Sequence, residues 1–200
     1  MASTSSDNGT SPAPGGGGRD RRIVVMTVLG LISGLICASV EYWPDAISGL
    51  IPGREENVIG VVFGIVVGFY LYRLGLATAA KAVAFLVASE VSWLAAHYFA
   101  ADVAYDYARK VCESEWCSFM LAGIPAGVLG AGLLVMAIWF LFPFFRQPRL
   151  AIATVAVGGL TGALLGTGSV FILFPIWQAA FAYCFARGFP PAASPEARNS

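Results

Sequence analysis

The sequence predicts an all-α membrane protein, a bundle of six transmembrane helices with both termini in the cytoplasm. Apolar residues make up 58% of the 200 residues and charged residues only 12%, whereas a soluble domain carries about a quarter charged residues. The apolar residues gather in six long stretches, and the arginines and lysines fall mainly on alternate connections between them. These observations disfavour a water-soluble fold.

A helix needs about 20 apolar residues to cross the roughly 30 Å hydrocarbon layer of a bilayer. Residues 23–187 are predicted to form one transmembrane domain, with spans at 23–40, 57–74, 79–100, 119–142, 150–167 and 169–187. Residues 101–111 could extend the third of these helices beyond the membrane.

The N-terminal residues 1–22 are rich in Ser, Gly and Pro and contain no apolar run. They cannot bury enough apolar surface to fold, so they are predicted to be a disordered cytoplasmic tail. A cleavable signal peptide is the competing interpretation, because Arg21 and Arg22 precede an apolar run; an uncleaved first helix is favoured. Residues 188–200 are predicted to be a flexible cytoplasmic tail.

The orientation follows from the positive charges. Cytoplasmic loops carry an excess of Lys and Arg, and an even number of helices brings both termini to the same side. With the N-terminus in the cytoplasm, the outer side keeps only Arg54, Arg109 and Lys110. The cytoplasmic segments then collect the other nine of the 12 basic residues, namely Arg19, Arg21, Arg22, Arg73, Lys81, Arg146, Arg149, Arg187 and Arg198.

Glycines at four-residue spacing mark the second and fifth spans. In lipid, helices associate by close backbone approach and polar contacts, so each glycine face is predicted to pack against a neighbouring helix. The two helices are the middle ones of successive three-helix halves, which would also fit an inverted repeat; the general abundance of glycine in membrane helices is the simpler explanation. The glycines are Gly60, Gly64 and Gly68, and Gly158, Gly162 and Gly166.

The third span carries an acid, Glu90, about midway along its length. An acid at that depth costs roughly 2.5–3.5 kcal/mol on insertion scales, so the side chain should face the interior of the bundle. Desolvation disfavours the charged form, so a substantial fraction should be neutral near pH 7. Such a carboxyl can carry protons. The structural alternative is a protonated Glu90 that donates to a neighbouring carbonyl or to Gln178.

Two further polar residues belong to the predicted proton or substrate pathway. His97 follows Glu90 by about 10.5 Å along the helix, too far for a direct hydrogen bond. A water-linked relay is one interpretation of His97, and an interfacial residue is the favoured one. Gln178, in the sixth span, has donors and acceptors that lipid cannot satisfy, so it is the candidate partner of Glu90. Ser33 and Thr161 lie near the same depth, but such hydroxyls readily bond to their own helix.

The outer loop before the fourth span contains Cys112 and Cys117. A disulfide is predicted because this side should face an oxidising compartment. A redox role would call for Cys-x-x-Cys spacing, which is absent, and metal binding by this pair with His97 is disfavoured. Cys37 and Cys184 are read as ordinary buried thiols.

No catalytic or cofactor signature rises above background. The chain has one histidine, which excludes bis-histidine haem ligation and disfavours a histidine-rich zinc site. Neither a metal nor a cofactor is therefore expected, nucleic-acid binding has no support, and a membrane enzyme ranks third among the hypotheses.

The leading hypothesis is a small transporter or channel with Glu90 as its titrating intramembrane residue. The alternative is a non-catalytic accessory or assembly subunit whose glycine faces bind another membrane protein. The expected partners are the lipid bilayer and either a second copy or another membrane protein. The expected location is the cell membrane, of the bacterial inner-membrane type.

Overall fold

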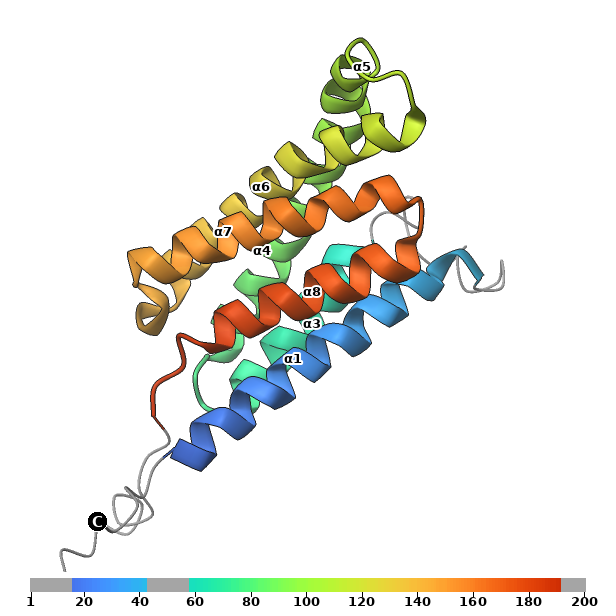
Figure 1. The fold of residues 1–200 in the computed structure, drawn as a ribbon. Coiled ribbons are helices and arrows are strands. Elements are labelled where there is room, and N and C mark those ends of the chain that lie inside the picture. Colours follow the sequence, from blue (N-terminus) through green and yellow to red (C-terminus); the bar gives the residue numbers. More distant parts are fainter. Residues whose placement is uncertain (1–15, 43–57, 192–200) are drawn as a thin grey trace, which may run out of the picture.

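The computed structural model describes residues 16–42 and 58–191, and every regular element in these two ranges is helical. The predicted all-α class is confirmed for this part of the chain. The longer helices are α1 (Gly16–Ser39), α3 (Ile59–Arg73), α4 (Ala79–Tyr98), α6 (Glu115–Leu141), α7 (Pro148–Gly162) and α8 (Val170–Ala186) (Figure 1). The short ones are η1 (Val40–Tyr42), the π-helical η3 (Phe99–Ala104), α5 (Tyr105–Ala108), η4 (Pro143–Phe145) and η5 (Ala163–Thr167).

Each of the six predicted apolar stretches is thus helical, but their lengths differ. Within the described ranges, four helices are long and apolar enough to cross a membrane, at Gly18–Ser39, Ala79–Ala108, Glu115–Leu141 and Pro148–Thr167. The other two, α3 and α8, have 15 and 17 residues. At 1.5 Å per residue, α3 is only about 22 Å long. The third helix continues through η3 and α5 to Ala108, as the sequence suggested.

The sequence explains where several helices begin and turn. The hydroxyl of Thr78 accepts from the backbone N–H of Lys81 at 3.3 Å and caps α4. Ser114 does the same for α6, accepting from the N–H of Cys117 at 3.3 Å. Such caps satisfy N–H groups that have no partner within the helix. Gly75, with φ of 69°, turns the chain between α3 and α4, a backbone conformation that favours glycine.

Part of the predicted N-terminal tail is helical. Helix α1 begins at Gly16, so residues 16–22 are helical, while residues 1–15 lie outside the described part. The predicted boundary was the start of the apolar run. Once that run has nucleated a helix, each further residue adds a hydrogen bond at little cost in free energy, so the helix can extend into the polar residues before it. The Arg19 guanidinium donates to the main-chain carbonyl of Arg187, which ties the start of α1 to the end of α8.

The C-terminal tail also differs from the prediction. Phe189 is 2% exposed, and its ring packs edge-on against Phe144 of η4 and Phe185 of α8. Residues 188 and 189 therefore continue the packed bundle, and residues 192–200 lie outside the described part. An aromatic side chain with a hydrophobic cluster beside it gains more from packing than from remaining in solvent.

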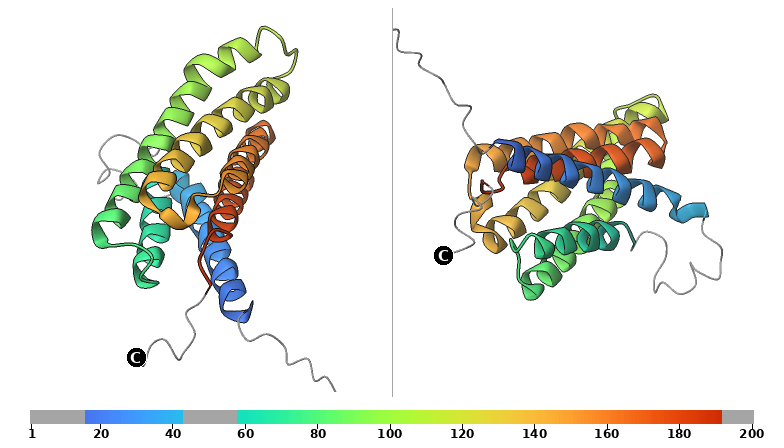
Figure 2. Two further views of the ribbon diagram at one scale, coloured as in Figure 1. Left: turned by 90° about the vertical axis from the view of Figure 1, so that its left-hand side faces the viewer. Right: turned by 90° about the horizontal axis from the view of Figure 1, so that it is seen from below.

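Among the described elements, the six longer helices form a closed ring. Each one contacts the next along the chain, and α8 closes the ring against α1 (Figures 1 and 2). The inside of the ring is filled at one end by a phenylalanine cluster that includes Phe63, Phe85, Phe142, Phe181 and Phe185. This is the end at which α1 begins and α8 ends.

The glycine faces pack against neighbouring helices of the same chain. Gly60, Gly64 and Gly68 of α3 meet α4, and a Cβ at Gly64 would lie 2.7 Å from the Cα of Leu86. Gly158 and Gly162 of α7 meet Gly127 and Gly123 of α6, whereas Gly166 lies in η5 against Met120. In an inverted repeat α3 would correspond to α7 and α4 to α8, so the glycine face of α7 would be expected to pack against α8. The two glycine faces are therefore not used equivalently.

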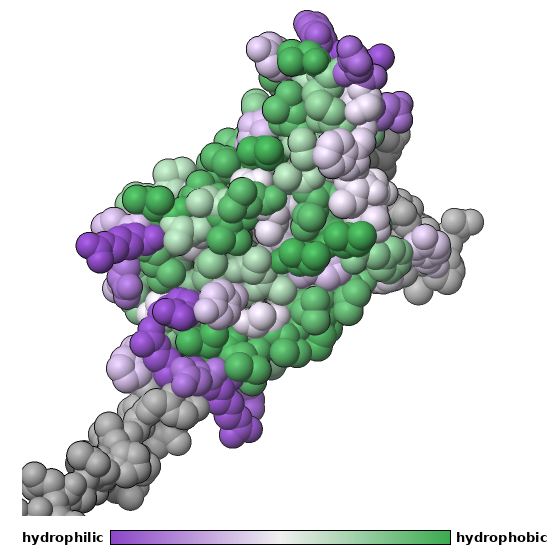
Figure 3. All heavy atoms as spheres, in the orientation of Figure 1, coloured by the Kyte–Doolittle hydropathy of each residue, from purple (hydrophilic) through white to green (hydrophobic). Residues whose placement is uncertain are grey.

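The surface of the bundle divides by polarity. In Figure 3, hydrophobic side chains cover the middle of the visible face, and hydrophilic ones gather around α5 at one end and around the start of α1 and the α6–α7 connection at the other. Large apolar side chains that are exposed on the helices include Ile65, Phe69, Val87 and Ile152.

Candidate functional site

Glu90 lies where α3 begins. Helix α4 runs antiparallel to α3, and successive contacts pair Gly68 with Ala82, Gly64 with Leu86 and Gly60 with Glu90. Because Gly60 is in the first turn of α3, the carboxyl group of Glu90 is held at the N-terminus of that helix.

The carboxyl group of Glu90, on the neighbouring helix α4, caps the N-terminus of α3. The residue before α3, Val58, provides no side-chain cap, and the Glu90 carboxyl faces the backbone N–H of Val61. The first N–H groups of a helix have no intrahelical partner and carry its positive dipole end, so a carboxylate is stabilised there. Oε2 is buried without a hydrogen-bond partner. A Cβ at Gly60 would lie 2.6 Å from this Oε2, so the arrangement depends on glycine.

Gln178 reaches the same helix start from α8. Its side chain is fully buried, and Nε2 donates to Cys37 Sγ of α1 at 3.4 Å. The Cys37 thiol donates in turn to the carbonyl of Ile59, the first residue of α3, at 3.6 Å. Oε1 of Gln178 is buried without a partner. Among the described residues no hydrogen bond joins Gln178 directly to Glu90; the two meet through the first turn of α3.

Ser33 lies one helical turn before Cys37 on α1 and is fully buried. Its Oγ has no hydrogen-bond partner, whereas Thr161, at a similar predicted depth, donates to the carbonyl of Val157 at 2.8 Å. Ser33, Cys37, Glu90 and Gln178 are called the polar cluster below. Apart from Arg19 Nε, three atoms of this cluster are the only buried side-chain nitrogen or oxygen atoms without a partner in the described part.

His97 lies in a separate cavity. About 90 Å³ of space opens between α4, α6, η5 and α8, lined largely by apolar side chains and by glycines of α6 and α7. Trp93 packs edge-on against Phe174 with ring centroids 5.4 Å apart, and His97 lies 5.6 Å from Trp93. Because Trp93 follows Glu90 by one turn of α4, the cavity wall and the polar cluster share a helix.

The structure therefore places Glu90 and Gln178 at the N-terminus of α3, whereas His97 lies apart from them in the wall of the cavity. Sequence reasoning missed Cys37, which it read as an ordinary buried thiol; Cys37 is buried and not disulfide-bonded, but it connects three helices. The signal that could have found it is the four-residue spacing of Ser33 and Cys37, which places both on one face of α1.

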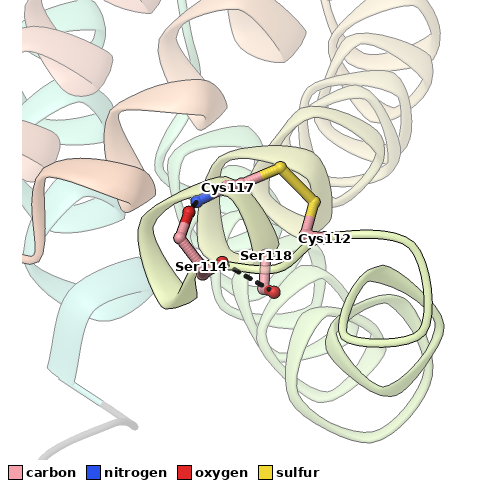
Figure 4. The surroundings of a disulfide bond; sticks show 4 residues. All are labelled: Cys112, Ser114, Cys117 and Ser118. Carbon is pink, nitrogen blue, oxygen red and sulfur yellow. Dashed lines mark hydrogen bonds between the residues drawn. A yellow bond between two sulfur atoms is a disulfide. The ribbon is translucent and has the colours of Figure 1, made fainter.

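The predicted disulfide is present in the connection between α5 and α6. Cys112 and Cys117 are joined, with Cα atoms 5.7 Å apart, just where α6 begins (Figure 4). Ser114 lies inside the ring that the disulfide closes, and the Ser118 hydroxyl donates to the carbonyl of Ser114 at 3.1 Å. The disulfide and the cap together fix the first turn of α6.

Comparison of the chain with protein-family models, curated proteins and solved structures gives no match. The function is therefore argued from the polar cluster and the cavity.

Proposed function

We propose that the protein is an integral membrane protein of six spans, with both termini in the cytoplasm and α5 on the outer side of the cell membrane. The distribution of Lys and Arg supports this orientation. The hydrogen bond between Arg19 and Arg187 supports it too, because it joins the first and last long helices at one end of the bundle. In this proposal α3 and α8 complete the six crossings, although each is shorter than the bilayer core is thick.

We further propose that the protein is a small transporter in which Glu90 takes up and releases protons. The observation that carries this proposal is Glu90 Oε2, a buried carboxyl oxygen without a partner. An ionisable residue within a membrane segment is costly, and where it is retained it commonly marks an ion or proton pathway. A purely structural acid would be expected to use both oxygens in hydrogen bonds.

The cavity beside α4 supplies the outer access in this proposal. It is lined by residues on the α5 side of Glu90, namely Trp93 and His97. Waters need polar partners to enter an apolar space, and His97 offers one there. On the opposite side of Glu90 the phenylalanine cluster closes the bundle, so access from the cytoplasm would need those rings to move.

The test is proton flux into liposomes that contain the purified full chain. Wild type should acidify the lumen under an imposed pH gradient faster than protein-free liposomes do, and Glu90→Gln should return the rate to that of protein-free liposomes. Asp106→Asn, at an exposed acid of α5, is the matched control and should retain the wild-type rate. Equal rates for wild type and Glu90→Gln would end the proton-carrier proposal.

The alternative of an accessory subunit is supported by the scarcity of recognisable chemistry and by the small extramembrane portion of the chain. Because the glycine faces of α3 and α7 pack against α4 and α6 of this chain, a partner would have to bind another surface.

A further inference from the structure

We propose that the polar cluster binds a single monovalent cation between α1, α4, α8 and the first turn of α3. The inference rests on the proposed transport function and names the chemical class of what is carried. The ligands would be the side-chain oxygens of Ser33, Glu90 and Gln178.

The three atoms of the polar cluster that lack a hydrogen-bond partner are all oxygens with lone pairs. Oε2 of Glu90 and Oε1 of Gln178 can accept, and the Ser33 hydroxyl oxygen has lone pairs to offer. Each acceptor buried without a partner destabilises the folded protein. No neighbouring side chain in the described part supplies the missing donors. A positively charged species would satisfy all three oxygens, and hard cations prefer such oxygen ligands.

The contacts of the polar cluster place Glu90 and Gln178 at the first turn of α3. Cys37 Sγ lies 3.4 Å from Nε2 of Gln178 and 3.6 Å from the carbonyl oxygen of Ile59. The next residue, Gly60, lies directly against Glu90 Oε2. Gly30 and Gly34 of α1 pack against the backbone of α8 from Phe174 to Gln178, and the fully buried Ser33 belongs to this stretch of α1.

The charge of the cluster limits the ion to a single positive charge. Glu90 is the only ionisable side chain in it besides the Cys37 thiol, and the Glu90 carboxyl faces the Val61 N–H from α3. A divalent ion would leave an uncompensated charge inside the bundle, which is strongly unfavourable. Within the described residues no three His, Cys, Asp or Glu side chains come together, so a transition metal has too few ligands.

An alkali cation and a hydronium ion share this chemistry, and the experiment distinguishes them. Thermal unfolding of the purified full chain is measured in detergent at equal ionic strength in NaCl, KCl, LiCl or choline chloride. An ion that binds only the folded state raises the melting temperature in a saturable way. The variants are Glu90→Gln and the milder Ser33→Ala; Thr161→Ala, which removes a hydroxyl bonded only within its own helix, is the matched control.

For an alkali cation, one salt should raise the melting temperature of wild type and Thr161→Ala. Glu90→Gln should abolish this shift, and Ser33→Ala should move it to higher salt. For hydronium, no salt has an effect, but Ser33→Ala slows the liposome proton flux while Thr161→Ala does not.

The proposal is overturned if no salt shifts the melting temperature and Ser33→Ala carries protons at the wild-type rate, because the cluster then holds neutral water at most. Wild-type flux in that result leaves the transport function standing. A salt shift without any wild-type proton flux would instead retain the cation site and remove the proton-carrier function.

Discussion

Glu90 illustrates how one side chain in a low-dielectric environment can serve two purposes. One side of its carboxyl group faces the first turn of α3 at Val61, and Oε2 remains buried without a partner. The positive end of α3 partly offsets the cost of placing an acid among apolar helices. In the proposed function the residue therefore has a structural and a proton-carrying role, and variants that preserve its shape separate the two.

The capping role predicts different effects for two substitutions at this position. Glu90→Ala removes the acceptor at the start of α3, so the free energy of unfolding should fall by about 0.5–2 kcal/mol, the usual cost of losing a helix cap. Glu90→Gln keeps an acceptor oxygen and should lose less. The measurement is unfolding in detergent together with hydrogen exchange at the Val61 amide, which should speed up mainly in the alanine variant. Identical exchange in both variants would argue against the cap.

A polar side chain in an apolar run was enough to single out some residues of the polar cluster and not others. Glu90 and Gln178 were found because a carboxyl or amide in an apolar run is costly. Ser33 and Cys37 were not assigned to the site, because a serine commonly bonds to its own helix and a buried cysteine behaves as a small apolar residue. Their roles depend on the contact between α1 and α8, whose residues Cys37 and Gln178 are 141 positions apart.

At the scale of single helices, the glycine pattern predicted packing faces without predicting what would cover them. Four-residue spacing depends only on the local helix, whereas the choice of partner depends on how the whole chain closes. Helix starts set by Thr78 and Ser114 have local signals. The early start of α1 at Gly16 has none, because the Gly-rich composition of that segment is typical of a tail.

Two glycines of α6 provide a matched test of close helix packing. At Gly127 a Cβ would collide with the backbone carbonyl of Gly158 in α7, whereas at Gly132 it would meet nothing within 4 Å. Gly127→Ala should therefore lower the free energy of unfolding by about 1–3 kcal/mol, as overpacking typically does. Gly132→Ala should leave it unchanged or raise it by up to about 1 kcal/mol, because alanine favours the helix. Thermal unfolding in detergent measures both, and equal losses would contradict the assigned α6–α7 interface.

At the scale of the whole molecule, the described helices close into a ring because α8 returns to α1. Gly30 and Gly34 allow that approach, with a Cβ at Gly30 only 2.6 Å from the carbonyl oxygen of Gln178. The ring places the phenylalanine cluster at the end where Arg19 meets Arg187 and leaves the cavity toward α5. This asymmetry gives the proposed pathway an open outer half and a closed inner half.

The central claim is that lipid surrounds this ring, with α5 outside and the start of α1 inside. Single cysteines at three exposed positions, Asp20→Cys, Asp106→Cys and Gln147→Cys, are treated with a membrane-impermeant maleimide in intact cells and again after lysis. The account predicts that the cysteine at position 106 is labelled in intact cells, and that those at positions 20 and 147 are labelled only after lysis. Labelling of positions 106 and 147 from the same side of the intact membrane would contradict it, because α6 would then not cross the bilayer.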